Sequence, residues 1–145
     1  MPNTVADAGK LISLVACFNS RQEMLLLKRP DDVPCGGFWS FPGGKVEAKE
    51  LPLQAAVREL EEESGLKGRL WRHLGKSSHR SEQGLLHFLF FICQCHDMDA
   101  FEPESQYAWV KRDALVDYSM PVANEKLVHM LFIPEVDDYL STADT

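Results

Sequence analysis

The sequence predicts one domain, spanning 1–145, of the α/β or α+β class. In two segments, 53–64 and 124–132, apolar residues recur at the three- and four-residue spacing of a helix. Elsewhere, short apolar runs end at Gly, Pro or polar turn residues, as strands do. Because strands and helices are interleaved along the chain, we expect a sheet packed against helices. With 145 residues, 45% of them hydrophobic, the chain can bury an ordinary core.

Strands are predicted wherever an apolar run is bounded by turn signals. In chain order they cover residues 11–18, 23–29, a short stretch that begins at 38 and runs into a glycine turn, 70–76, 85–95 and 107–110. The segment 30–37 is rich in Pro and Gly and is predicted to be a loop.

The two helices are predicted from periodicity, and Gly65 is a stop signal for the first of them. Side chains at this spacing are expected to face the core: Leu53, Ala56, Val57 and Leu60 in the first helix, and Leu127, Met130 and Leu131 in the second. The last residues, 141–145, are expected to fray.

Charge and composition exclude several functions. The formal net charge of −7 argues against a nucleic acid polymer as partner, because strong binding to phosphates needs a basic surface. It does not argue against a small phosphorylated substrate, since a bound divalent ion can invert the sign of a local field. We find no signal peptide at the N-terminus and no apolar run of about eighteen residues, so no membrane association is predicted. The oligomeric state is not predictable.

The cysteines indicate a reducing compartment. The chain has four, and none forms a C-x-x-C pair: Cys17, Cys35, Cys93 and Cys95. Free thiols in the cytoplasm are therefore favoured over disulfides or a zinc site.

An acidic helix end is the first candidate for chemistry. The stretch RELEEESGL, residues 58–66, carries Glu59, Glu62 and Glu63 at i, i+3 and i+4, so these carboxylates lie on one helical face. Convergent carboxylates suit a hard cation such as Mg²⁺ or Mn²⁺. For the helix alone, a solvated acidic face, softened by pairing of Arg58 with Glu62, is the favoured explanation.

The preceding loop favours the metal. Gly43 and Gly44 allow the backbone to approach a ligand closely, and Lys45 supplies a positive charge suited to phosphate. From Gly44, the chain continues through Glu50 to Arg58-Glu59-Leu60-x-Glu62-Glu63-x-Gly65. This pattern resembles the signature of the Nudix hydrolase family at every fixed position over residues 44–66.

The resemblance implies an α/β/α sandwich with a mixed sheet, and divalent metal-dependent hydrolysis of a nucleoside diphosphate linked to a moiety X. It implies metal ligation by Glu59, Glu62, Glu63 and the Gly43 carbonyl, with Arg58 orienting the carboxylates and Glu50 closing the loop. Glu104 resembles a late glutamate that serves as metal ligand or general base, and Glu102 is the alternative. Lys49 stands where many members have glycine, which costs about 1 kcal/mol if the turn needs a positive φ.

The flanks resemble the MutT-type branch, which hydrolyses oxidised guanine nucleoside triphosphates. By that resemblance Asn124 reads the purine, although its position before Glu125 also suits a helix N-cap. Lys45 and Arg29 are the candidates for phosphate binding, and Phe41 and Phe88 for lining a base pocket. The alternatives are a Nudix enzyme for ADP-ribose, a dinucleoside polyphosphate or a pyrimidine triphosphate, and a non-catalytic nucleotide-binding module.

Overall fold

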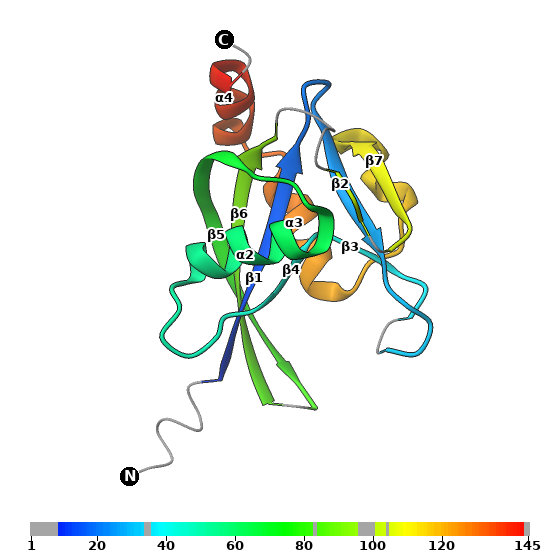
Figure 1. The fold of residues 1–145 in the computed structure, drawn as a ribbon, viewed down its shortest axis with the longest axis vertical. Helices are drawn as coiled ribbons and strands as arrows, with labels where there is room; N and C mark the ends of the chain where they lie inside the picture. Colours follow the sequence, from blue (N-terminus) through cyan, green and yellow to red (C-terminus); the bar gives the residue numbers. More distant parts are fainter. Residues whose placement is uncertain (1–8, 34–35, 83, 96–100, 104, 144–145) are drawn as a thin grey trace.

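The fold is a mixed sheet between helices (Figure 1). A computed structural model describes residues 9–33, 36–82, 84–95, 101–103 and 105–143. In chain order the elements are β1 (Lys10–Phe18), β2 (Glu23–Lys28), β3 (Trp39–Ser40), β4 (Gly43–Lys45), α2 (Pro52–Ser64), β5 (Arg69–Ser81), β6 (Gly84–Gln94), β7 (Tyr107–Lys111), the 3-10 helix η2 (Arg112–Asp117), α3 (Val122–Met130) and α4 (Pro134–Ala143).

Strand β1 lies at the centre of the sheet. The strand order is β3-β2-β1-β6-β5, with β4 paired to β1 and β7 paired to β2. β1 runs parallel to β6 and antiparallel to β2 and β4. The short antiparallel pairing with β4 holds the glycine turn against the middle of β1, with Gly43 opposite Leu14 and Gly44 opposite Ser13. The predicted mixed sheet is confirmed.

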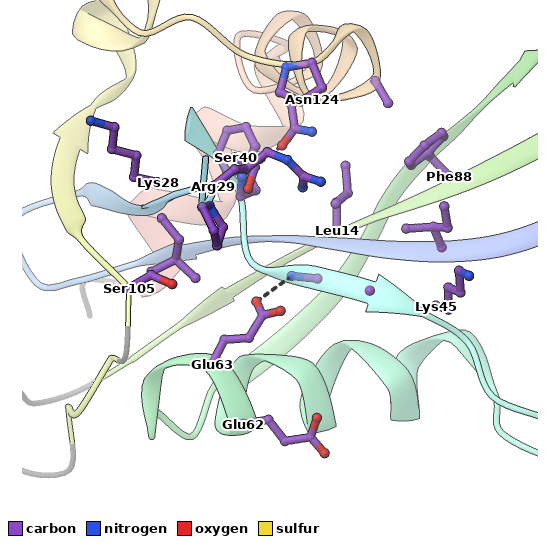
Figure 2. A pocket seen from close by; sticks show the side chains of 18 residues that line it. Leu14, Lys28, Arg29, Ser40, Lys45, Glu62, Glu63, Phe88, Ser105 and Asn124 are labelled. Atoms are coloured by element: carbon purple, nitrogen blue, oxygen red, sulfur yellow. Dashed lines mark hydrogen bonds between the residues drawn. The ribbon is translucent and has the colours of Figure 1, made fainter. Parts of the chain in front are cut away.

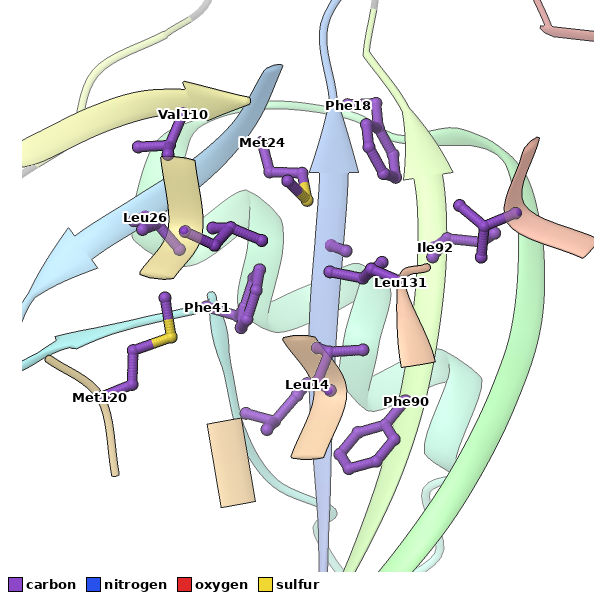
Figure 3. Packing of buried hydrophobic residues seen from close by; sticks show 14 of the residues in the cluster. Leu14, Phe18, Met24, Leu26, Phe41, Phe90, Ile92, Val110, Met120 and Leu131 are labelled. Carbon is purple, nitrogen blue, oxygen red and sulfur yellow. The ribbon is translucent and has the colours of Figure 1, made fainter. Parts of the chain in front are cut away.

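Alternation along β1 sends successive side chains to opposite faces of the sheet. Val15 and Cys17 pack on the side of α2, whereas Leu14 and Ala16 join the cluster that α3 and α4 cover. Figure 1 shows α2 crossing one face and α3 behind the other. Leu14, Phe41 and Leu131 belong to the cluster on the side of α3 and α4 (Figure 3). The predicted α/β/α sandwich is therefore confirmed.

The inward face of α2 differs in part from the prediction. Ala56 and Leu60 are fully buried as expected, but Leu53 is 42% exposed and Val57 37% exposed. The helix instead presents Ala55, Ala56, Leu60 and Ser64 to the sheet. Small alanine side chains let the helix axis lie close to the strands, so the wider leucine and valine positions fall outside the contact. In α3, Leu127 and Leu131 are fully buried and Met130 packs at the edge of the core.

The C-terminal helix α4 is absent from the prediction, and residues 141–143 lie in it rather than fraying. Its core contacts come from Val136, Tyr139 and Leu140, which are 0%, 3% and 2% exposed. Arg112 holds the start of α4, since its Nη1 lies 2.9 Å from Asp137 Oδ1. β5 is also longer than the predicted 70–76.

The cysteines that the structure describes are free and buried: Cys17, Cys93 and Cys95. Cys35 lies outside the described residues. Among the helices described, none has the length and apolar character to cross a membrane.

Candidate active site

A cavity of about 480 Å³ lies where the glycine turn, the end of α2 and the start of α3 meet the sheet. Its wall combines apolar side chains from β1 and β6 with polar groups from β2, β3, β4, α2, α3 and the loops. Figure 2 shows Asn124 on one side of the cavity and Glu62 and Glu63 on the other. The structure therefore brings most of the predicted site residues to one place: Arg29, Phe41, Gly43, Lys45, Glu62, Glu63, Phe88 and Asn124 line the cavity.

The glycine turn lies against both the sheet and α2. A Cβ on Gly44 would lie 2.6 Å from the Glu59 carboxylate, and a Cβ on Gly43 would lie 2.1 Å from the Ser13 carbonyl oxygen. The backbone clash makes glycine necessary at position 43, whereas a side chain at position 44 would displace the Glu59 carboxylate. The Gly43 N–H donates to Glu63 Oε1 at 3.0 Å, which fixes the turn relative to the acidic helix.

Arg58 ties the acidic groups together from the outer side. Its Nε donates to Glu50 Oε2 at 2.8 Å, and its Nη1 donates to Glu59 Oε1 at 2.7 Å and to Glu62 Oε1 at 3.2 Å. Its Nη2 reaches the Lys45 carbonyl at 3.1 Å. The Arg58 guanidinium and the Glu47 backbone N–H lower the pKa of Glu50 to about 2, and the carboxylates raise the pKa of Arg58.

The loop between the turn and the helix is closed by Glu50. The backbone N–H of Glu47 donates to Glu50 Oε1 at 2.9 Å, and Glu50 N–H donates to the Glu47 carbonyl at 3.0 Å. This tight turn places Lys49 at φ 67°, in the left-handed region. The positive φ on which the predicted cost of lysine depended is therefore present. A lysine there costs about 1 kcal/mol relative to glycine.

Glu63 is a site carboxylate whose pKa is strongly raised. Burial raises its pKa to about 8. The hydrogen bond with Glu59 and repulsion by Glu59 and Glu62 act in the same direction, and the Gly43 N–H opposes them. Carboxylates crowded in this way suit a hard divalent cation, whose charge would relieve both burial and repulsion.

The acidic cluster is only partly assembled. Glu59 and Glu63 are in contact, whereas the Glu62 side chain is 59% exposed and turned to Arg58. Within the part of the chain that the structure describes, no three His, Cys, Asp or Glu side chains form a complete metal-ligand group. The oxygen donors fit the chemistry of Mg²⁺ or Mn²⁺, with Glu59, Glu63 and the Gly43 backbone nearest to one another.

Asn124 is not the helix cap. The N-cap of α3 is Pro121, and Asn124 lies within the first turn, 5% exposed. Its Oδ1 accepts a hydrogen bond from the buried Phe41 N–H at 2.8 Å. The capping alternative is therefore wrong: the side chain is anchored across the cavity wall instead, next to the apolar surface of Phe41 and Phe88.

The remaining predicted residues are less well placed. Glu104 lies outside the described residues. Glu102 is exposed, and its N–H donates to the Ser64 carbonyl at 2.8 Å, at the end of α2. Lys28, Ser40 and Ser105 line the cavity without having been predicted. Only the neighbour Arg29 could have pointed to Lys28, and nothing in the sequence pattern indicates the two serines.

A turn that holds a glycine backbone against paired carboxylates, beside an apolar cavity, defines a hydrolase site for phosphorylated nucleotides. The NUDIX domain model matches residues 10–131, and the chain belongs to the Nudix family. It is a Nudix pyrophosphohydrolase, of a family that generally uses divalent metal ions and acts on small nucleotides.

Several relatives are MutT-like. An 8-oxo-dGTP diphosphatase from Haemophilus influenzae is 37% identical over 92 residues, covering 63% of this chain and 68% of the relative. A CTP pyrophosphohydrolase from Escherichia coli is 27% identical over 121 residues, covering 82% and 90%. A structure from an analysis of MutT from Aliivibrio salmonicida and Vibrio cholerae has 36% identity and TM-score 0.66, covering 89% of this chain and 98% of that one.

Proposed function

We propose that the chain hydrolyses oxidised purine nucleoside triphosphates, such as 8-oxo-dGTP, to the monophosphate and pyrophosphate. One observation carries the proposal: Asn124, with its amide anchored by Phe41, shares a single cavity with the glycine turn and Glu63. A base reader and a phosphate-cleaving centre in one cavity suit a nucleotide substrate. The 8-oxo-dGTP diphosphatase relatives support the same substrate class.

In this mechanism Glu59, Glu62, Glu63 and the Gly43 carbonyl would hold Mg²⁺ or Mn²⁺. When bound there, the metal would supply polarisation of the phosphoryl oxygens and a lower pKa for the attacking water. Water adds to one phosphorus, the P–O bond to the bridging oxygen breaks, and one proton is released. Arg58 orients Glu59 and Glu62 from the outer side, while Lys45 and Arg29 offset negative charge on the phosphates. Glu104, or alternatively Glu102, accepts the proton of the water or completes the metal site.

Base selection follows from the hydrogen-bonding groups of Asn124. Its Nδ2 donates to the base, and the second lone pair of Oδ1 remains available after Phe41 takes the first. Oxidation of guanine at C8 turns N7 from an acceptor into an N–H donor. The free lone pair of Oδ1 therefore accepts a hydrogen bond from oxidised guanine but faces an acceptor in guanine itself.

A second candidate is a pyrimidine triphosphate. The CTP pyrophosphohydrolase from Escherichia coli aligns over more of this chain than the Haemophilus influenzae relative does, at lower identity. A cytosine also presents a donor and an acceptor to an amide.

The experiment is a substrate panel with Mg²⁺, in which pyrophosphate release is measured for 8-oxo-dGTP, dGTP and CTP, and release of AMP is measured for ADP-ribose. We expect the highest kcat/KM for 8-oxo-dGTP, with monophosphate and pyrophosphate as products. A higher kcat/KM for CTP would replace the purine proposal with the pyrimidine one. The cytoplasm, where free nucleotides and reduced thiols coexist, is the compartment that suits this activity.

A further inference from the structure

A second cavity, of about 270 Å³, adjoins the active-site cavity. It is lined by Lys28, Arg29, Pro30, Asp31, Ser105 and Gln106. Four of these six residues, namely Lys28, Arg29, Pro30 and Ser105, also line the larger cavity, so the two spaces adjoin. A ligand that fills the first cavity therefore reaches residues that bound the second.

The second cavity lies away from Phe88. In Figure 2, Lys28 and Ser105 lie on one side of Glu63 and Phe88 lies on the other, with Asn124 above. A nucleotide whose base contacts Phe88 and whose phosphates reach the glycine turn can extend its terminal phosphates toward Lys28 and Ser105.

The groups around the second cavity suit an anion. Lys28 and Arg29 outnumber the single acid Asp31, and Ser105 and Gln106 add a hydroxyl and an amide that can donate hydrogen bonds. Lys28 is partly buried at the end of β2, yet its ammonium pairs with no carboxylate among the residues that the structure describes. A partly buried cation without a counter-charge favours an anionic ligand. This concentration of positive charge is unusual in a chain whose net charge is −7.

A strand-end lysine that only extends into water would be exposed. Lys28 is instead partly buried and lines the cavity that adjoins the active-site cavity. The position also answers an electrostatic need. Glu59, Glu62 and Glu63 repel the phosphates that must approach them, and the metal offsets that repulsion only at its own position. The terminal phosphates lie beyond the metal and require cations of their own.

We propose that the second cavity binds the pyrophosphate half of a nucleoside triphosphate, and that Lys28 makes the site prefer triphosphates over diphosphates. The identity of the whole substrate rests on the function proposed above, whereas binding of pyrophosphate at Lys28 does not. Lys28 contacts the terminal phosphates directly, and Ser105 donates a hydrogen bond to them. The departing pyrophosphate leaves through this cavity while the monophosphate stays beside Asn124.

The test compares Lys28→Gln with the parent, using one nucleoside as triphosphate and as diphosphate. Lys76→Gln is the matched control, since Lys76 is exposed on β5 and lines neither cavity. We expect the ratio of kcat/KM for triphosphate over diphosphate to fall about tenfold in Lys28→Gln, as for one lost hydrogen bond to a charged group. The Lys76→Gln ratio should match that of the parent.

Direct binding separates this proposal from the function proposal. Calorimetry with Mg²⁺ and inorganic pyrophosphate should show a Kd about tenfold higher in Lys28→Gln, while the Kd of the nucleoside monophosphate changes less than twofold. If no triphosphate is hydrolysed but pyrophosphate binding depends on Lys28, the substrate proposal fails and the pyrophosphate site stands. Equal pyrophosphate affinity in parent and variant, or an equal loss for triphosphate and diphosphate, overturns the pyrophosphate site.

Discussion

Replacing Asn124 tests the substrate proposal most sharply, because its amide has two separable roles. One is the structural hydrogen bond with Phe41, and the other is the proposed recognition of the base. The oxygen accepts from the Phe41 N–H at 2.8 Å between two residues that are 5% and 2% exposed. Asn124→Ala leaves that buried N–H without a partner, which should lower the free energy of unfolding by about 1–3 kcal/mol. In the proposed mode of recognition, the same change also removes the groups that would read N7 and O6 of the base.

The expected kinetic effect is a loss of discrimination. Removing a hydrogen bond to oxidised guanine costs about 1–3 kcal/mol, so the ratio of kcat/KM for 8-oxo-dGTP over dGTP should fall by roughly 5- to 150-fold. A partly unfolded sample lowers both rates equally, so the ratio is insensitive to the loss of stability. Steady-state kinetics with both nucleotides at 25 °C, below the unfolding transition, measures it.

Asn124→Asp is the matched variant. The carboxylate keeps an oxygen for Phe41 and a lone pair for N7–H, but it has no N–H to donate to O6. We expect both rates to fall while the ratio of 8-oxo-dGTP over dGTP stays near the parent value. The recognition argument is refuted if Asn124→Ala keeps the parent's ratio, because the amide would then only hold Phe41 in place.

Four further outcomes follow from the acidic residues of the site. Activity should need Mg²⁺ or Mn²⁺, and full activity in excess EDTA contradicts this. Glu62→Gln should nearly abolish kcat while the circular dichroism spectrum stays unchanged; a kcat within twofold or threefold of the parent contradicts this. The pKa of Glu63 is raised to about 8, so its carboxylate is charged at pH 9; there Glu63→Gln keeps an oxygen for the Gly43 N–H but removes a charge beside Glu59, so in EDTA at pH 9 its melting temperature should exceed that of the parent, and an equal or lower value argues against repulsion. The pKa of Glu50 is lowered to about 2, so the stability that its pair with Arg58 contributes is present above pH 4.5 and lost as the pH falls toward 2. The melting temperatures of the parent and Glu50→Gln should therefore converge over that range, and a constant difference contradicts the ion-pair account.

Local patterns predicted the elements and the acidic face because their causes are local. Glu59, Glu62 and Glu63 share a helical face by spacing alone, and the apolar runs of β1 and β6 alternate between two buried clusters. The α4 helix was not predicted, because its apolar face is short. It consists of Val136, Tyr139 and Leu140, and this pattern does not indicate a helix without the sheet that the residues cover.

Contacts between distant segments could not be predicted. The Asn124–Phe41 hydrogen bond joins residues 83 positions apart, and the sequence alone left base recognition and a helix cap both open for Asn124. Whether Asn124 caps the helix depends on where α3 begins. The N-cap is Pro121, three residues before Asn124, so Asn124 lies inside the helix. The second cavity likewise needs the end of β2 to meet the segment before β7. The backbone bond from Lys28 N–H to the Gln106 carbonyl at 2.9 Å makes that junction.

The arginine of the signature has a physical role that the spacing alone does not explain. Arg58 contacts Glu50, Glu59 and Glu62, whereas Glu63 accepts from the Gly43 N–H and lies against Glu59. Arginine thus neutralises the cluster on its outer side and not where it faces the cavity. A divalent cation is favoured at that inner position, because its charge would take the place of the proton that burial and repulsion hold on Glu63. If Arg58 sat between Glu59 and Glu63 instead, the same residues would form an ordinary ion-pair network with little affinity for metal.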